Sequence, residues 1–136
     1  MVLEQLHLVR LSLWAGASIV AGTAILAFLR AARRQSAVLL HFAVQCALWG
    51  VVDLGLVLSA RGDLELRDLA GAVALDRFLW FNIGLDVGYV LIGATLALIG
   101  WRLGRRGGLV GAGIGIIVQG LALALLDLQL SANIVR

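Results

Sequence analysis

The sequence has few charged residues and no lysine, and its polar content is too low for an ordinary soluble domain. Only 14% of the 136 residues are charged and 62% are hydrophobic, with a mean hydropathy of +1.03. Soluble domains carry about a quarter charged residues. The apolar stretches also leave no room for a separate soluble domain.

Proline is absent, and cysteine occurs once, as Cys46. Proline is a common cause of sharp helix kinks, so its absence predicts fairly straight helices. A single cysteine excludes an internal disulfide. We interpret Cys46 as a small buried apolar side chain.

Four long apolar stretches fill nearly all of the chain. We predict helices at about 8–30, 37–60, 78–101 and 109–132. A helix of about 20 residues crosses the hydrocarbon core and satisfies its own backbone groups in lipid. The sequence therefore predicts an all-α fold, a single domain (1–136) consisting of a four-transmembrane-helix bundle.

The cations are concentrated in two short loops. All eleven basic residues are arginines, and six of them lie in the loops 30–36 and 102–108. Cytoplasmic loops are enriched in arginine, so we expect both loops in the cytoplasm and both termini outside. The net charge of +3 follows from this topology, and we exclude nucleic acid as a partner.

The second half repeats features of the first. Residues recur at offsets of 72 and 74: Arg33 as Arg105, Gln45 as Gln119, and Asp53 as Asp127. We predict an internal repeat, 8–60 and 78–132, that forms two tandem helical hairpins. Because both hairpins would run in the same direction, their pseudo-two-fold axis would lie along the membrane normal.

Glycines four residues apart mark the third and fourth predicted helices. Gly84 and Gly88 form one pair, and Gly107, Gly111 and Gly115 form a longer series. Small residues at this spacing let helix backbones approach closely in lipid. They serve either packing inside one bundle or an interface for a homodimer or a larger membrane complex.

The loop between residues 61 and 77 allows two interpretations. Its apolar residues lie near one helical face, which is typical of a short helix on the outer surface. The alternative is that the third helix starts earlier.

Polar side chains inside the predicted helices are the candidates for function. Such residues are costly in a membrane and usually face the bundle interior. Asn82, Asp86 and Tyr89 share an arc of roughly 60° on one helix. The candidate ligand-binding residues are Asp53, Asp86, Asp127, Asn82, Tyr89, Gln45, Gln119 and Arg10.

The acids of this cluster outnumber its cations. At 1.5 Å per residue, Asp53 and Asp86 lie roughly 10 to 12 Å below the outer boundary, and Asp127 is shallower. Arg10 is the one helical cation expected at that level. Pairing cannot neutralise all three carboxylates, so we expect protons, water or a cationic ligand from outside to do so.

A purely structural polar network is the alternative interpretation. Amide side chains in membrane helices often serve only to join helices. The pairs expected in that case are Asp127 with Arg10, Asp53 with Asn82, and Asp86 with Tyr89 or Gln119.

No recognisable catalytic motif is present, and we expect no enzyme. The carboxylates lack a nucleophile with an oriented base at their depth. Zinc is disfavoured because no histidine or cysteine lies at that level. Oxygen ligands suit Na⁺, Ca²⁺ or Mg²⁺, but no motif specifies a metal or a cofactor.

The run WFNIGLDVGY at 80–89, followed by Gln119-Gly120 and Asp127, resembles a family of short bacterial four-helix integral membrane proteins with no assigned function. The resemblance lies mainly in the second half. It implies that the polar residues of these segments form one unit in a bacterial inner membrane, and it implies no activity.

Two hypotheses follow. The first is a non-enzymatic bundle, a carrier or receptor-like module, that binds a cation, a proton or a small polar ligand at the carboxylates of the outer half. The second is a non-catalytic accessory subunit of a larger membrane complex, which the small size and the glycine-lined helix faces favour.

Overall fold

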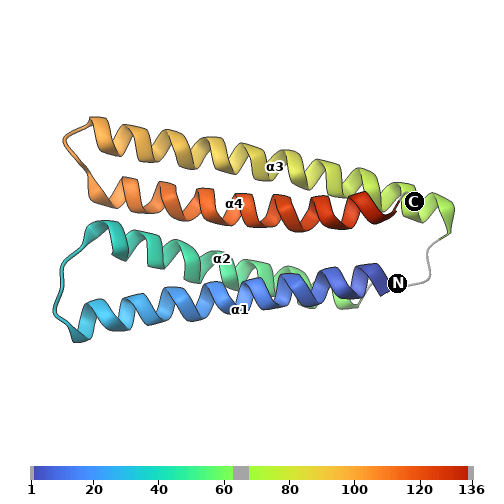
Figure 1. The fold of residues 1–136 in the computed structure, drawn as a ribbon, viewed down its shortest axis with the longest axis horizontal. Coiled ribbons are helices and arrows are strands. Elements are labelled where there is room, and N and C mark those ends of the chain that lie inside the picture. The colour runs from blue at the N-terminus through green and yellow to red at the C-terminus, as the bar shows by residue number, and fades with distance from the viewer. Residues whose placement is uncertain (1, 63–67, 135–136) are drawn as a thin grey trace.

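The structure is a computed structural model that describes residues 2–62 and 68–134. Its helices are α1 (Val2–Ala31), α2 (Ala37–Arg61), α3 (Leu69–Arg102) and α4 (Gly107–Ile134). These described residues contain no strand. The predicted all-α four-helix bundle is confirmed (Figure 1).

Helix α3 begins at Leu69, well before the predicted start near residue 78. The carboxylate of Asp68 accepts a hydrogen bond from the backbone N–H of Gly71 at 2.8 Å. This cap satisfies one of the free N–H groups that every helix start exposes. The third helix therefore starts earlier, and the preceding loop residues 63–67 lie outside the described residues.

The two short loops share an uncommon backbone conformation. Arg33 has φ of 49° and Arg105 has φ of 56°, and no other non-glycine residue of the described segments has a positive φ. L-residues rarely adopt this left-handed region. The internal repeat stays a prediction, and the shared turn at two positions related by the offset of 72 favours it.

Glycines bring the helices of each hairpin into backbone contact. A Cβ on Gly22 of α1 would lie 2.6 Å from the carbonyl oxygen of Ala43 on α2. A Cβ on Gly93 of α3 would lie 2.7 Å from the carbonyl oxygen of Gly113 on α4. No side chain fits at these positions unless a helix shifts, so each hairpin is closely packed.

The two hairpins join through α2 and α4 near the short loops. A Cβ on Gly111 would overlap the carbonyl oxygen of Val38, and one on Gly115 would lie 2.6 Å from the Cβ of Gln45. The glycine series of α4 therefore serves packing inside the bundle. The hairpins are not equivalent, because α1 approaches α4 whereas no Cα atoms of α2 and α3 within the described segments come within 8 Å.

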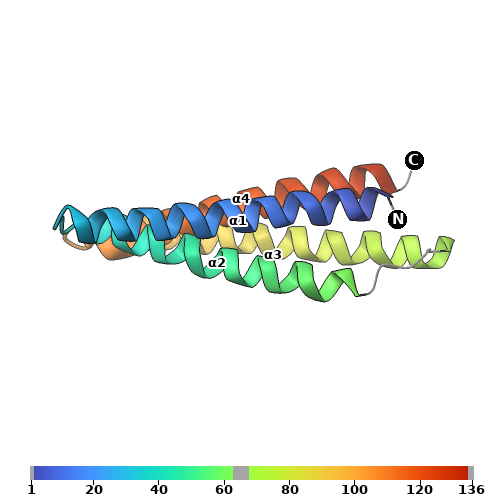
Figure 2. The same cartoon turned by 90° about the horizontal axis from the view of Figure 1, so that it is seen from below.

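The bundle changes shape along its length. At the end with the two short loops, the helices lie side by side in the order α1, α2, α4, α3 (Figure 1). The perpendicular view shows this end as thin. It also shows the other end, which carries both termini, separated into a layer of α1 with α4 and a layer of α2 with α3 (Figure 2). Toward the termini the four helices therefore surround an interior.

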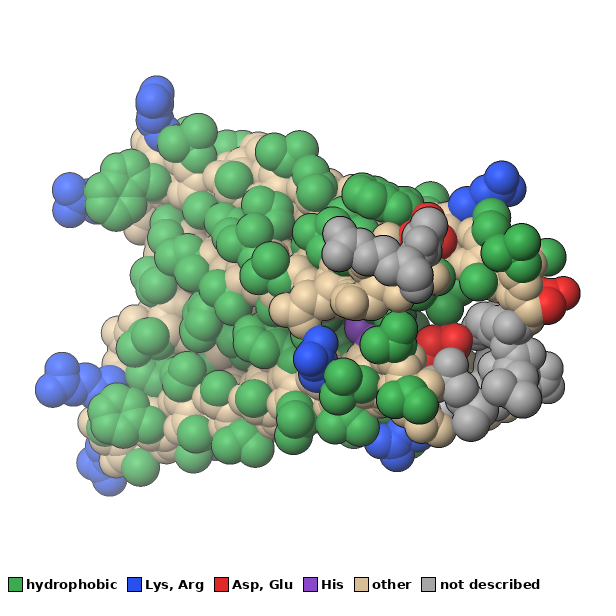
Figure 3. Space-filling model, turned by 45° about the vertical axis from the view of Figure 1, so that its right-hand side comes forward, with side chains coloured by type: hydrophobic (Ala, Val, Ile, Leu, Met, Phe, Trp, Pro, Cys, Tyr) green, Lys and Arg blue, Asp and Glu red, His purple; other side chains and the backbone are tan. Residues whose placement is uncertain are grey.

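The outside of the bundle is apolar and its interior is partly polar. All four helices are long and apolar enough to cross a membrane. Large side chains such as Leu13 and Leu48 are exposed, and Figure 3 shows hydrophobic groups over the flank between charged ends. Among the described residues, the largest fully buried side chains are Gln119, Val57 and Asp53. This arrangement suits a bundle surrounded by lipid.

Candidate functional site

Asp53 of α2 is the most isolated polar side chain of the described segments. It is 0% exposed, and neither of its carboxylate oxygens has a hydrogen-bond partner there. The structural pair expected between Asp53 and Asn82 is therefore not formed. Burying an ionised carboxylate without a partner is costly, so this side chain requires either a proton or a cation beside it.

Asp86 of α3 is the second carboxylate of the cluster and is 5% exposed. Asp127 and, more weakly, Asp53 act on Asp86 electrostatically. Three helices thus each contribute one acid to the same neighbourhood. Like charges repel strongly where the dielectric constant is low, so the group favours the arrival of positive charge.

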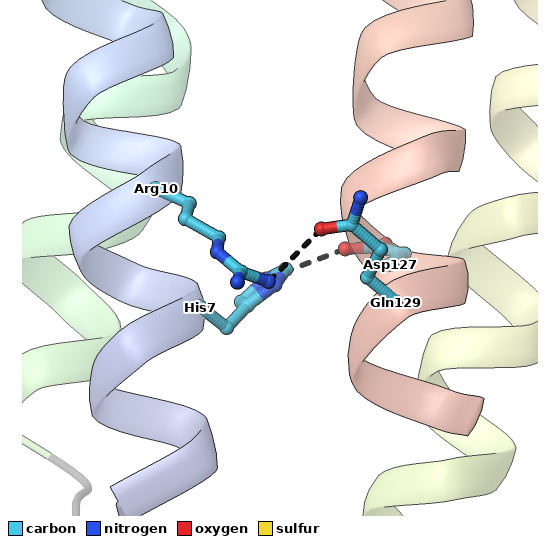
Figure 4. Close-up of polar contacts among 4 residues, drawn as sticks. All are labelled: His7, Arg10, Asp127 and Gln129. Carbon is cyan, nitrogen blue, oxygen red and sulfur yellow. Dashed lines mark hydrogen bonds and ion pairs between the residues drawn. The ribbon is translucent and has the colours of Figure 1, made fainter. Parts of the chain in front are cut away.

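Asp127 of α4 pairs with His7 of α1 rather than with Arg10. The His7 Nε2 lies 3.4 Å from Asp127 Oδ1, and their side chains are 12% and 14% exposed. Arg10 instead donates a hydrogen bond to Oε1 of Gln129 at 2.9 Å. Figure 4 shows both contacts crossing from α1 to α4. The expected pair failed because His7, one turn closer to the terminus, reaches Asp127 while Arg10 extends to an exposed amide.

Gln119 of α4 makes two side-chain hydrogen bonds to α1. It is 1% exposed, and its Oε1 accepts a hydrogen bond from Trp14 Nε1 at 2.8 Å. Its Nε2 donates to Ser18 Oγ at 3.2 Å. The pair expected between Gln119 and Asp86 is not formed, and Gln119 acts as a bridge between the hairpins.

Two aromatic rings lie next to the pair Asp53 and Asp86. The ring centroids of Trp49 on α2 and Tyr89 on α3 are 5.1 Å apart, with an interplanar angle of 68°. Trp49 precedes Asp53 by one turn, and Tyr89 follows Asp86 by one turn. Because α2 and α3 run in opposite directions, both rings lie on the short-loop side of the carboxylates.

The remaining candidates take different places. Asn82 is half-buried on α3, one turn from Asp86 toward the termini. Gln45 is half-buried against Gly115, about 12 Å along α2 from Asp53. The structure therefore groups Asn82 with the carboxylates and places Gln45 at the contact between α2 and α4.

Three contributors from α1 were missing from the sequence-based candidates: His7, Trp14 and Ser18. Their spacing in the sequence could have identified them. Together with Arg10 they are spaced by 3, 4 and 4 residues, which puts all four on one helical face. That polar face of α1 turns toward α4.

The acidic side chains do not form a preformed metal-binding site. Within residues 2–62 and 68–134, no three histidine, cysteine, aspartate or glutamate side chains are placed to hold one metal ion. The three carboxylates thus share a neighbourhood without converging on a single point.

Comparison with known families gives one match, to the model described as "Family of unknown function (DUF6992)", which covers residues 10–128. The chain belongs to this family. The match spans both hairpins, so the family likeness extends beyond the second half, on which the sequence-based resemblance mainly rested. No curated protein and no solved structure matches the chain.

Proposed function

We propose that this protein binds a cation, a proton or a small polar ligand at the cluster of Asp53, Asp86 and Asp127, as a carrier or a receptor-like module. The observation that carries this proposal is the fully buried carboxylate of Asp53, whose two oxygens have no partner in the described segments. A structural network would satisfy such a group, because unsatisfied buried acceptors reduce stability.

The surrounding polar residues have separate roles in this proposal. Asn82 and Tyr89 orient the ligand beside Asp86, while Gln119 and Gln45 hold the helices around it. We propose binding without catalysis, because the sequence offers no recognisable nucleophile at the depth of the carboxylates.

Access in this proposal comes from the end that carries the termini. A cavity of about 160 Å³ lies there between α1 and α4. Its polar lining consists of His7, Arg10, Gln129 and Asn133. Because His7 of this lining also contacts Asp127, the cavity lies beside one of the three carboxylates.

The orientation in the membrane is part of the proposal. Both arginine-rich loops lie in the cytoplasm of a bacterial cell, and both termini lie outside the inner membrane. The cavity between α1 and α4 then opens to the outer side.

Native mass spectrometry of protein extracted gently from its own membranes tests the binding function. We expect a bound small species in the wild type that disappears in Asp53→Asn and Asp86→Asn. Asp76→Asn is the matched control, because Asp76 accepts a hydrogen bond from Ser131 at 2.6 Å outside the cluster. A species that survives both cluster variants, or none at all, would contradict the proposal.

A second candidate function is that of an accessory subunit or homodimer partner. Gly84 and Gly88 of α3 face open space, with no atom within 4 Å of where a Cβ would be. They are therefore free to pack against another helix. A larger stoichiometric complex in the same spectra that is lost in Gly84→Leu would favour this function, and a monodisperse partner-free protein would count against it.

A further inference from the structure

We infer that the ligand of the carboxylate cluster is a primary ammonium group, held between Asp53 and Asp86 next to the rings of Trp49 and Tyr89. This inference rests on the proposed function and narrows it to one ligand class.

The two buried carboxylates of the site are hydrogen-bond acceptors when they are ionised. Asp53 offers two unpartnered oxygens, and Asp86 adds a second carboxylate from the neighbouring helix. The half-buried Asn82 amide and Tyr89 hydroxyl can donate hydrogen bonds at the edge of the site, but neither side chain carries positive charge. A complementary ligand must therefore bring both positive charge and several N–H donors, and a primary ammonium carries three.

The aromatic pair supports the same ligand class. Ammonium groups are attracted to the faces of aromatic rings, most strongly to tryptophan and most of all where water is excluded. Trp49 and Tyr89 lie one turn from the two carboxylates on the same side of both. Carboxylates combined with aromatic walls distinguish this site from one built for a bare inorganic ion.

Divalent metal cations fit less well. Ca²⁺ takes six to eight oxygen ligands, and Mg²⁺ demands near-octahedral geometry. The described acids include no three that converge on one point. An ammonium group tolerates this spread, because its N–H donors reach separate acceptors in different directions.

Two kinds of molecule carry the primary ammonium group that this inference requires. One is a free amine that enters through the cavity between α1 and α4. The other is the headgroup of an ethanolamine phospholipid from the surrounding bilayer. The lipid composition of the test separates the two.

The test uses the full chain in nanodiscs of phosphatidylcholine, whose headgroup has no N–H donor. We expect propylammonium to raise the thermal midpoint on the order of 10 °C at a hundredfold excess over Kd. Tetramethylammonium, Na⁺ and Ca²⁺ should leave the midpoint unchanged. The shift should persist in Asp76→Asn and vanish in Asp53→Asn.

The aromatic contact has its own test. Trp49→Leu should weaken propylammonium binding by roughly 2- to 30-fold, and an unchanged affinity would overturn the role of the ring. If the source is lipid, nanodiscs with phosphatidylethanolamine raise the midpoint without added amine, and Asp53→Asn removes that rise.

The outcomes separate the ligand class from the function. Stabilisation by Na⁺ or Ca²⁺ that depends on Asp53, with none by propylammonium, would overturn the ammonium class and leave the proposed function standing. A midpoint that changes only with pH, through Asp53, would replace the ammonium by a proton. If no probe acts through Asp53, the ammonium inference fails, and native mass spectrometry then decides whether the proposed function stands with a neutral polar ligand.

Discussion

The indole Nε1 of Trp14 donates a hydrogen bond to Oε1 of Gln119 at 2.8 Å, which ties the first helix to the last. The same amide donates to Ser18, one turn further along α1. Gln119 is 1% exposed, so water cannot replace either bond. This bridge is a structural connection between the hairpins, separate from the unpartnered carboxylate of Asp53.

Replacing the bridging amide should therefore destabilise the bundle. We expect Gln119→Leu to lower the free energy of unfolding by about 1–3 kcal/mol, because the indole N–H of Trp14 loses its acceptor and the hydroxyl of Ser18 loses its donor. Reversible unfolding by SDS in mixed micelles measures this loss. Combining the change with Trp14→Phe should give less than the sum of the two single losses, and full additivity would contradict direct coupling.

Replacing Asp53 should have the opposite effect. We expect Asp53→Val to raise the free energy of unfolding without ligand by about 1–3 kcal/mol, because a buried carboxylate without a partner is removed. The same SDS titration applies, with Asp76→Asn as a control of little effect. A clear loss of stability in Asp53→Val would instead mean that this carboxylate serves as structural glue.

The contact between α2 and α4 can be tested with a pair of glycines. A Cβ on Gly111 would overlap the carbonyl of Val38, so Gly111→Ala should cost about 1–3 kcal/mol of stability. Gly55 has no atom within 4 Å of its Cβ position, and Gly55→Ala should be neutral or stabilise by up to about 1 kcal/mol. Equal effects at both sites would argue against this contact.

Labelling of single cysteines tests the proposed orientation in the membrane. In a Cys46→Ala background, an impermeant maleimide added to intact spheroplasts should label Ala132→Cys and not Gln35→Cys. Both positions are exposed, one near the C-terminus and one in a short loop. Permeabilised cells should label at both sites, which controls for reactivity. Labelling of Gln35→Cys alone in intact spheroplasts would reverse the proposed topology.

The helices themselves were predictable because lipid leaves the backbone few alternatives. Runs of about 20 apolar residues must satisfy their peptide groups internally, which identifies them as helices. Inward-facing acids were also predictable, because polar side chains avoid lipid. Asp53 and Asp86 are indeed buried.

The partners of these side chains were not predictable. They depend on how each helix is rotated against its neighbours, which composition and spacing leave open. Asp127 thus finds His7 instead of Arg10. The repeat implied equal places for Gln45 and Gln119, yet only Gln119 is fully buried, because α1 approaches α4 while α3 stays away from α2.

The start of α3 shows a second limit of prediction from the sequence. The apolar residues near Leu69 fit either a surface helix or an extension of α3, and the cap by Asp68 places the helix start there. Capping preferences are local and weak, about 1 kcal/mol. They become informative only once the path of the chain into the helix is known.

The glycine contacts of the bundle have a mechanical consequence. At Gly111 and Val38 the backbones of α4 and α2 are in direct contact, with no space for a side chain between them. At the far end, α1 and α4 meet through side-chain bridges such as Arg10 with Gln129, which can break one at a time. The molecule is therefore stiff at one end and compliant at the other. If the protein binds a ligand as proposed, we expect the ligand to enter between α1 and α4 at the compliant end, because the contact between α2 and α4 need not change there.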